Sequence, residues 1–80
     1  RGLPCMTASE AREAYERLTP RLKDVLVMVA DGHSSKAIAT KLNISLKTVE
    51  FHRRRLHQQL GIRGDALLAR FAVRVGVVAD

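Results

Sequence analysis

The chain of 80 residues has little of what builds disulfide frameworks, aromatic cores or membrane spans. Its single cysteine, Cys5, has no partner for an intrachain disulfide, which suits a reducing cytoplasm. There is no signal peptide, and no apolar run approaches the ~18 residues of a membrane-spanning helix. Aromatic residues are 4% of the chain and tryptophan is absent, so the core must be built from leucine, valine, isoleucine and alanine. We therefore expect a cytoplasmic protein without a membrane partner.

Catalytic and metal-binding patterns are also missing. The sequence contains no pair of carboxylates at a plausible separation, no Cys–His pair in register and no glycine-rich phosphate loop. His52 invites a metal hypothesis, but His57 is five residues away, which is not ligand spacing on a helix. An 80-residue chain forms one small domain and has no room for a cleft between two lobes. We expect no enzyme, no cofactor and no bound metal.

What the chain does have is positive charge in one region. The formal net charge is +6, from 14 lysines and arginines against 8 acidic residues. Within residues 1–18 three arginines cancel three glutamates, so the whole excess lies in residues 19–80. A localised basic excess fits a polyanionic partner such as nucleic acid or an acidic membrane surface. Charge alone leaves open that the chain is simply a soluble basic domain.

The hydrophobic pattern predicts an all-α fold. Helices are expected over about 20–30, 36–42, 46–60 and 65–75, with no strand pattern anywhere. Thr19-Pro20 is a good helix start, and Gly61 is a good stop. Residues 1–17 are expected to be a linker or a lead-in helix from a missing upstream domain, since the chain begins with Arg-Gly rather than methionine.

The helix expected over 46–60 has two different faces. Val49, Leu56 and Leu60 recur at helical spacing and mark the inward face. Cations, an amide and an aromatic ring mark the opposite face: Lys47, Phe51, Arg54 and Gln58. With the short helix and three-residue turn before it, this segment predicts a helix-turn-helix whose second helix suits the DNA major groove.

The same residues carry a resemblance to a known family. The landmarks are Leu18-Thr19-Pro20-Arg21, Val25-Leu26, Gly32, Lys36, Ile38-Ala39, Leu42, Ile44-Ser45, Thr48-Val49, His52 and Leu60-Gly61. In this order and spacing, over about residues 18–76, the chain resembles the LuxR-type DNA-binding domain, the output module of NarL/FixJ-class response regulators and of quorum sensors. The resemblance implies a four-helix domain, here placed at 18–80, that binds double-stranded DNA as a homodimer through its last helix and regulates transcription.

Site residues follow from the resemblance position by position. Those matching base-facing positions are Glu50, Phe51 and Arg54. Those expected to face phosphates are Lys36, Lys47, Thr48, His52, Arg53 and Arg55. Those expected in the dimer interface, outside the core stripe of the last helix, are Leu67, Arg70, Phe71 and Arg74. Three alternatives stay open: Glu50 as a charge that steadies the helix macrodipole, Arg53 as a stem that covers the core, and Phe71 as packing against the lead-in segment.

Three positions depart from the family pattern. Leu22 stands where the family usually has glutamate, so a reciprocal cap is lost and an apolar group is expected on a normally polar face. Val27 replaces what is often a charged residue, and Gly64 replaces the usual serine that caps the last helix. We expect Leu22 and Val27 to mark a contact with the missing domain.

Within the family, two kinds of regulator compete. The acid-rich segment 8–18 resembles the linker after a receiver domain, which favours a two-component response regulator over a quorum sensor. RNA polymerase is a further expected partner of such a regulator. Outside the family, the remaining alternative is a basic protein-interaction module.

Overall fold

The computed structural model describes residues 7–78, and these form five α-helices and no strand. The helices are α1 (Ala8–Glu16), α2 (Pro20–Ala30), α3 (Ser35–Leu42), α4 (Leu46–Leu60) and α5 (Asp65–Val75). The all-α prediction is confirmed, and the helices expected from the sequence begin and end within one residue of those observed. Cys5 lies outside the described residues.

Short polar residues set where the helices begin. Thr19, Ser34 and Ser45 each accept a hydrogen bond from the backbone N–H three residues on, at the starts of α2, α3 and α4. Such caps satisfy backbone donors that the first helical turn leaves unpaired. At the other end of α4, Gly61 adopts a left-handed conformation with φ 66°, which glycine reaches without steric cost. The helix-turn-helix is thus delimited by local chemistry at both ends.

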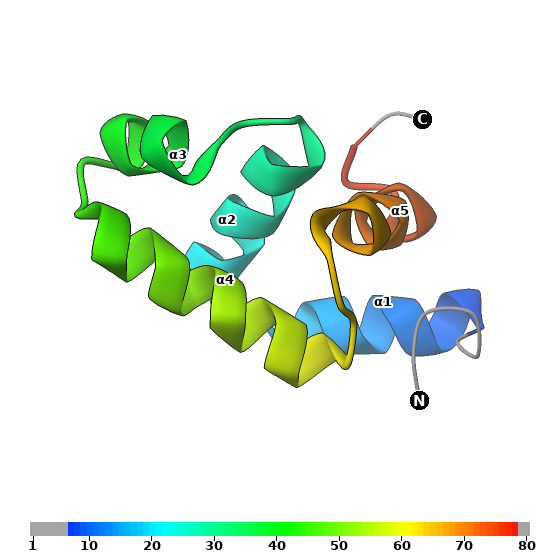
Figure 1. Cartoon of the computed structure of the whole chain (residues 1–80). Helices are drawn as coiled ribbons and strands as arrows, with labels where there is room; N and C mark the ends of the chain where they lie inside the picture. The colour runs from blue at the N-terminus through cyan, green and yellow to red at the C-terminus, as the bar shows by residue number, and fades with distance from the viewer. Residues whose placement is uncertain (1–6, 79–80) are drawn as a thin grey trace.

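Helix α2 lies at the centre of the fold. It packs against α5 on one side and against α4 and α3 on another, while α3 packs directly on α4 (Figure 1). The core is mostly aliphatic, with Val25, Leu26, Ile38, Val49 and Leu56 all fully buried, and the one aromatic ring fully buried among the described residues is that of Phe71. The two helices α3 and α4 share this core across the three-residue turn 43–45. Packing in the core therefore fixes the orientation of α4 and supplies most of its stability.

The segment before residue 18 is a helix that takes part in the core. Thr7 and Glu10 form a reciprocal capping box at the start of α1. Ala11 and Ala14 are buried, and α1 packs against α5. Of the two expectations for this segment, linker or lead-in helix, residues 8–16 take the helical one, so the structure has five helices where the family resemblance implied four.

Two placements expected from the sequence are wrong. Phe71 is fully buried rather than outside the core stripe of α5. Leu22 is only 4% exposed and belongs to the core, so it does not present an apolar group on a polar face. In both cases packing between distant helices decides the burial, because α5 packs against both α1 and α2.

Candidate nucleic-acid interface

Helix α4 divides into a buried face and a charged face. Val49, Leu56 and Leu60 are buried as expected. The exposed side chains of the helix are Leu46, Lys47, Glu50, Phe51, Arg54, Arg55, Gln58 and Gln59. We call Leu46, Lys47, Glu50, Phe51, Arg54 and Arg55 the reading face. Its charged members make no hydrogen bond or ion pair with any residue that the structure describes, so their charges are available to a ligand.

Glu50 is the fifth residue of α4, beyond the first turn. A helix macrodipole acts mainly on charges within the first or last turn. The position therefore gives little support to a macrodipole role and leaves an uncompensated carboxylate beside Arg54 on the reading face. A carboxylate there can accept a hydrogen bond from a base amino group.

The expected phosphate-facing residues fall into two groups. Lys36, Lys47 and Arg55 are exposed, whereas Thr48, His52 and Arg53 are half-buried. The Thr48 hydroxyl lies 2.8 Å from that of Ser45. The exposed cations come from the start of α3 and the reading face of α4, so the helix-turn-helix carries them from both of its helices.

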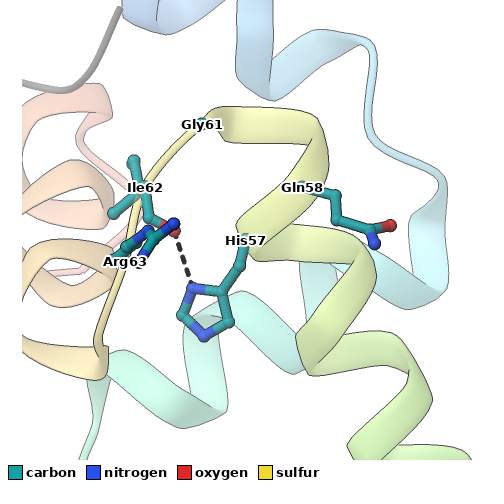
Figure 2. Close-up of a pocket in the computed structure, with 5 residues that line it drawn as sticks. All are labelled: His57, Gln58, Gly61, Ile62 and Arg63. Carbon is teal, nitrogen blue, oxygen red and sulfur yellow. Dashed lines mark hydrogen bonds between the residues drawn. The ribbon is translucent and has the colours of Figure 1, made fainter.

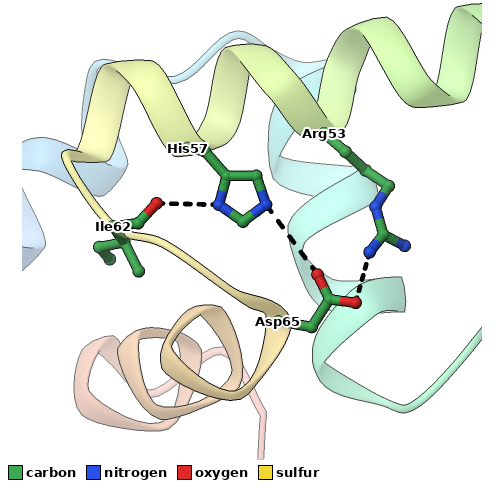
Figure 3. Close-up of polar contacts among 4 residues, drawn as sticks. All are labelled: Arg53, His57, Ile62 and Asp65. Atoms are coloured by element: carbon green, nitrogen blue, oxygen red, sulfur yellow. Dashed lines mark hydrogen bonds and ion pairs between the residues drawn. The ribbon is translucent and has the colours of Figure 1, made fainter.

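Arg53 is tied to the first residue of α5. Its guanidinium forms an ion pair and hydrogen bond with the Asp65 carboxylate (Figure 3). The Arg53 side chain is only 20% exposed. A guanidinium has five N–H donors, so Asp65 occupies only part of its hydrogen-bonding capacity. Arg53 thus links the reading helix to α5, a role that the sequence reasoning did not assign.

His57 contributes to the same cluster. Its Nδ1 lies 2.9 Å from the Ile62 carbonyl oxygen, and its Nε2 lies 4.0 Å from Asp65 Oδ1. Since a carbonyl oxygen only accepts, Nδ1 must donate, which orients the ring towards Asp65. Figure 2 shows the ring turned to Ile62 beside a pocket that Gly61 and Arg63 also line. The histidine therefore holds the turn after α4 rather than a ligand.

A second hollow borders the reading face. Leu22 of α2 and the capping residue Thr19 line it together with Phe51, His52 and Arg55 from α4. The rings of Phe51 and His52 are tilted against each other with centroids 5.9 Å apart. Phe51 is 52% exposed. Its ring therefore contacts that of His52 and is still half open to solvent.

The expected dimer residues do not form one exposed patch. Arg70 and Arg74 are exposed, Leu67 is half-buried, and Phe71 is in the core. Phe71 therefore cannot act as a surface contact in this fold. The expectation for the other three stays a prediction.

Two functional candidates escaped the sequence reasoning. Leu46, the first residue of α4, is 50% exposed, and the sequence reasoning assigned it to neither face of the helix. Asp65 gave no sequence signal, because its partners Arg53 and His57 lie 12 and 8 residues earlier. Within residues 7–78 no three His, Cys, Asp or Glu side chains gather as metal ligands would. No helix in that range is both long and apolar enough to span a bilayer.

The fold, together with the charged face of α4, the second helix of the helix-turn-helix, defines a protein of the kind found among transcriptional regulators. Comparison with known families is decisive: residues 16–72 match the family of bacterial regulatory proteins described as the luxR family, and the chain belongs to it. The predicted family is therefore confirmed. Members of this family are transcriptional regulators.

Relatives among curated proteins carry matching descriptions. Over 92% of its length the chain is 38% identical to the transcriptional regulatory protein MctR of Rhizobium johnstonii, covering 35% of that protein. It is 35% identical to the uncharacterized response regulatory protein YgeK of Escherichia coli over 94% of the chain and 51% of that protein. It is 38% identical to the response regulator GacA of Pseudomonas aeruginosa over 80% of the chain and 30% of that protein. The chain thus spans 30–51% of the length of these relatives.

Proposed function

We propose that this chain is the DNA-binding effector domain of a bacterial two-component response regulator, and that it binds double-stranded DNA sequence-specifically in the cytoplasm. The observation that carries the proposal is the reading face itself. A helix held by the core on one side presents unpaired cations and an acceptor on the other. Such a helix fits the major groove, where cations meet phosphates and base edges offer donors and acceptors.

Individual roles follow from chemistry and exposure. Arg54 is proposed to donate two hydrogen bonds to guanine O6 and N7, and Glu50 to accept one from cytosine N4. Lys36, Lys47 and Arg55 are proposed to contact phosphates, with His52 and Thr48 at the margin of the same surface. Arg53 reaches this surface only with the donors that Asp65 leaves free.

An upstream receiver-like domain is part of the proposal. It is supported by the descriptions of relatives as response regulators, and by the short share of their length that the chain covers. A quorum sensor of the same family would instead carry a small-molecule pocket upstream. RNA polymerase is proposed as a further partner once the regulator is on DNA.

Binding is proposed to involve two copies of the chain. Helix α5 offers Arg70, Arg74 and the half-buried Leu67 at its surface for a two-fold contact. Two copies would then meet half-sites about one helical turn apart.

Fluorescence anisotropy on duplex DNA across a salt series tests the proposal. We expect affinity to fall steeply with salt, because each phosphate contact releases a counterion. Arg54→Ala should relax the sequence preference at one base pair and weaken binding about tenfold, within the range for a bidentate base contact.

Arg12→Ala is the matched control, because it also removes one positive charge but from α1, where Arg12 pairs with Glu16. It should leave the affinity nearly unchanged. Negligible binding at low salt would contradict DNA binding and favour a basic protein-interaction module. Equal losses in both variants would contradict the assignment of Arg54.

A further inference from the structure

The two large apolar side chains exposed within residues 7–78 are both on one helix. Leu46 is 50% exposed and Phe51 is 52% exposed, and they stand first and sixth in α4. Elsewhere in that range, large hydrophobic residues are buried or half-buried. A fold that buries its apolar side chains this fully leaves these two in water at the end of the helix that would enter the groove.

Neither of them belongs to the buried core. The core contacts of α4 are made by Val49, Leu56 and Leu60. With about 100° of rotation per residue, Leu46 and Phe51 lie on opposite edges of the reading face, and Glu50 and Arg54 lie between them. The reading face is therefore a charged centre with an apolar side chain on each flank.

The charged residues next to Leu46 and Phe51 indicate which kind of partner could cover these two side chains. Lys47, Arg54 and Arg55 make no ion pair within the described part of the chain, and a protein surface covering Leu46 and Phe51 would have to desolvate all three cations. DNA offers phosphates to the cations and one apolar group in the major groove, the C5 methyl of thymine. The charge pattern thus favours DNA over an apolar protein partner.

We propose that Leu46 and Phe51 are specificity-determining residues that each contact a thymine methyl group, so that the preferred half-site carries thymines on both sides of the base pairs read by Glu50 and Arg54. This inference rests on the proposed DNA binding. Phe51 is suited to it because its ring already contacts the His52 ring, with centroids 5.9 Å apart, so little side-chain freedom is lost on contact. Leu46 is suited to it because it is the first residue of the helix, the end that enters the groove in helix-turn-helix proteins.

The test removes the methyl groups and changes nothing else in the DNA. The preferred duplex is first selected from a randomised pool with the 80-residue chain. Each thymine of its half-site is then replaced by deoxyuridine, one at a time, and binding is measured by anisotropy. We expect two positions at which the affinity falls about fourfold per methyl, the loss for one buried methyl-sized group.

Two variants assign each methyl to its side chain. Leu46→Ala should abolish discrimination between thymine and uracil at one position, and Phe51→Ala at the other. Lys47→Ala is the control, because loss of a phosphate contact should weaken both duplexes equally and keep the discrimination.

Unchanged affinity for uracil at every position would overturn the inference, and so would discrimination that survives in both variants. If salt-dependent binding and the Arg54→Ala effect persist in those cases, the proposed DNA binding stands without the inference. Absence of any salt-dependent binding would instead contradict the proposed function itself.

Discussion

Asp65, the first residue of α5, is shared between two residues of α4: it forms an ion pair with Arg53 and lies 4.0 Å from His57 Nε2. The residue before it, Gly64, provides no side-chain cap for α5. The Asp65 carboxylate therefore does two things at once. It joins the two helices, and it places a negative charge in the first turn of α5, where the macrodipole favours one.

We expect Asp65→Asn to lower the free energy of unfolding by about 1 kcal/mol, the combined size of a partly exposed ion pair and a macrodipole interaction. Urea denaturation followed by circular dichroism measures it. Asp24→Asn is the control, because Asp24 is exposed on α2 and pairs with no residue that the structure describes. Equal effects of the two substitutions would show that the link between Arg53 and Asp65 contributes nothing.

The two phenylalanines should behave in opposite ways. Phe71 is fully buried, and Phe71→Ala should cost about 3–5 kcal/mol, enough to unfold much of a domain of this size. Phe51→Ala should change the free energy of unfolding by less than about 0.5 kcal/mol, because Phe51 is half-exposed. Thermal and urea denaturation compare them. A stable Phe71→Ala variant that lost only self-association would restore the hypothesis that Phe71 is a dimer contact.

The cap of the reading helix can be tested by two substitutions at one position. The Ser45 hydroxyl accepts a hydrogen bond from the Thr48 N–H at 3.1 Å. Ser45→Ala should lower stability by about 1 kcal/mol, whereas Ser45→Gly should cost only a few tenths, as at other helix starts. Denaturant titration of the two variants provides the comparison, and a larger loss for glycine would argue against capping as the cause.

Phosphate contacts should be countable from salt dependence. Lys47→Ala and Arg55→Ala should each reduce the slope of log affinity against log salt by about 1, and weaken binding similarly on all sequences. Lys36→Ala tests the same role for α3. Arg12→Ala should leave the slope unchanged, since its charge is on α1 and pairs with Glu16. Identical slopes in all four variants would contradict the phosphate assignments.

Much of the fold was predictable because its determinants are local. The caps at Thr19 and Ser45, the stop at Gly61 and the stripe of Val49, Leu56 and Leu60 each act within a few residues. Such signals set helix boundaries and show which face of α4 is buried. The same helical spacing predicts that Phe51 lies outside the core, and this prediction needs no information about any other helix.

The errors arise where distant segments meet. The sequence around Phe71 and Leu22 does not distinguish a buried position from an exposed one. Only the packing of α1 and α2 against α5 makes both residues part of the core. The role of Asp65 could not be predicted for the same reason, because its partners lie on another helix. Leu46 was overlooked because leucine at a helix start fits a core stripe, although α4 begins one turn before its first core contact at Val49.

Helix α1 changes what the smallest independently folding piece of this protein can be. Its buried residues are Ala11 and Ala14, and it lies against α5. A fragment starting at Leu18 would match the family boundary closely, yet it would strip that covering layer and open part of the apolar surface of α5 to water. We therefore expect the smallest independently folding piece to include the capping box of Thr7 and Glu10, ahead of the helix-turn-helix.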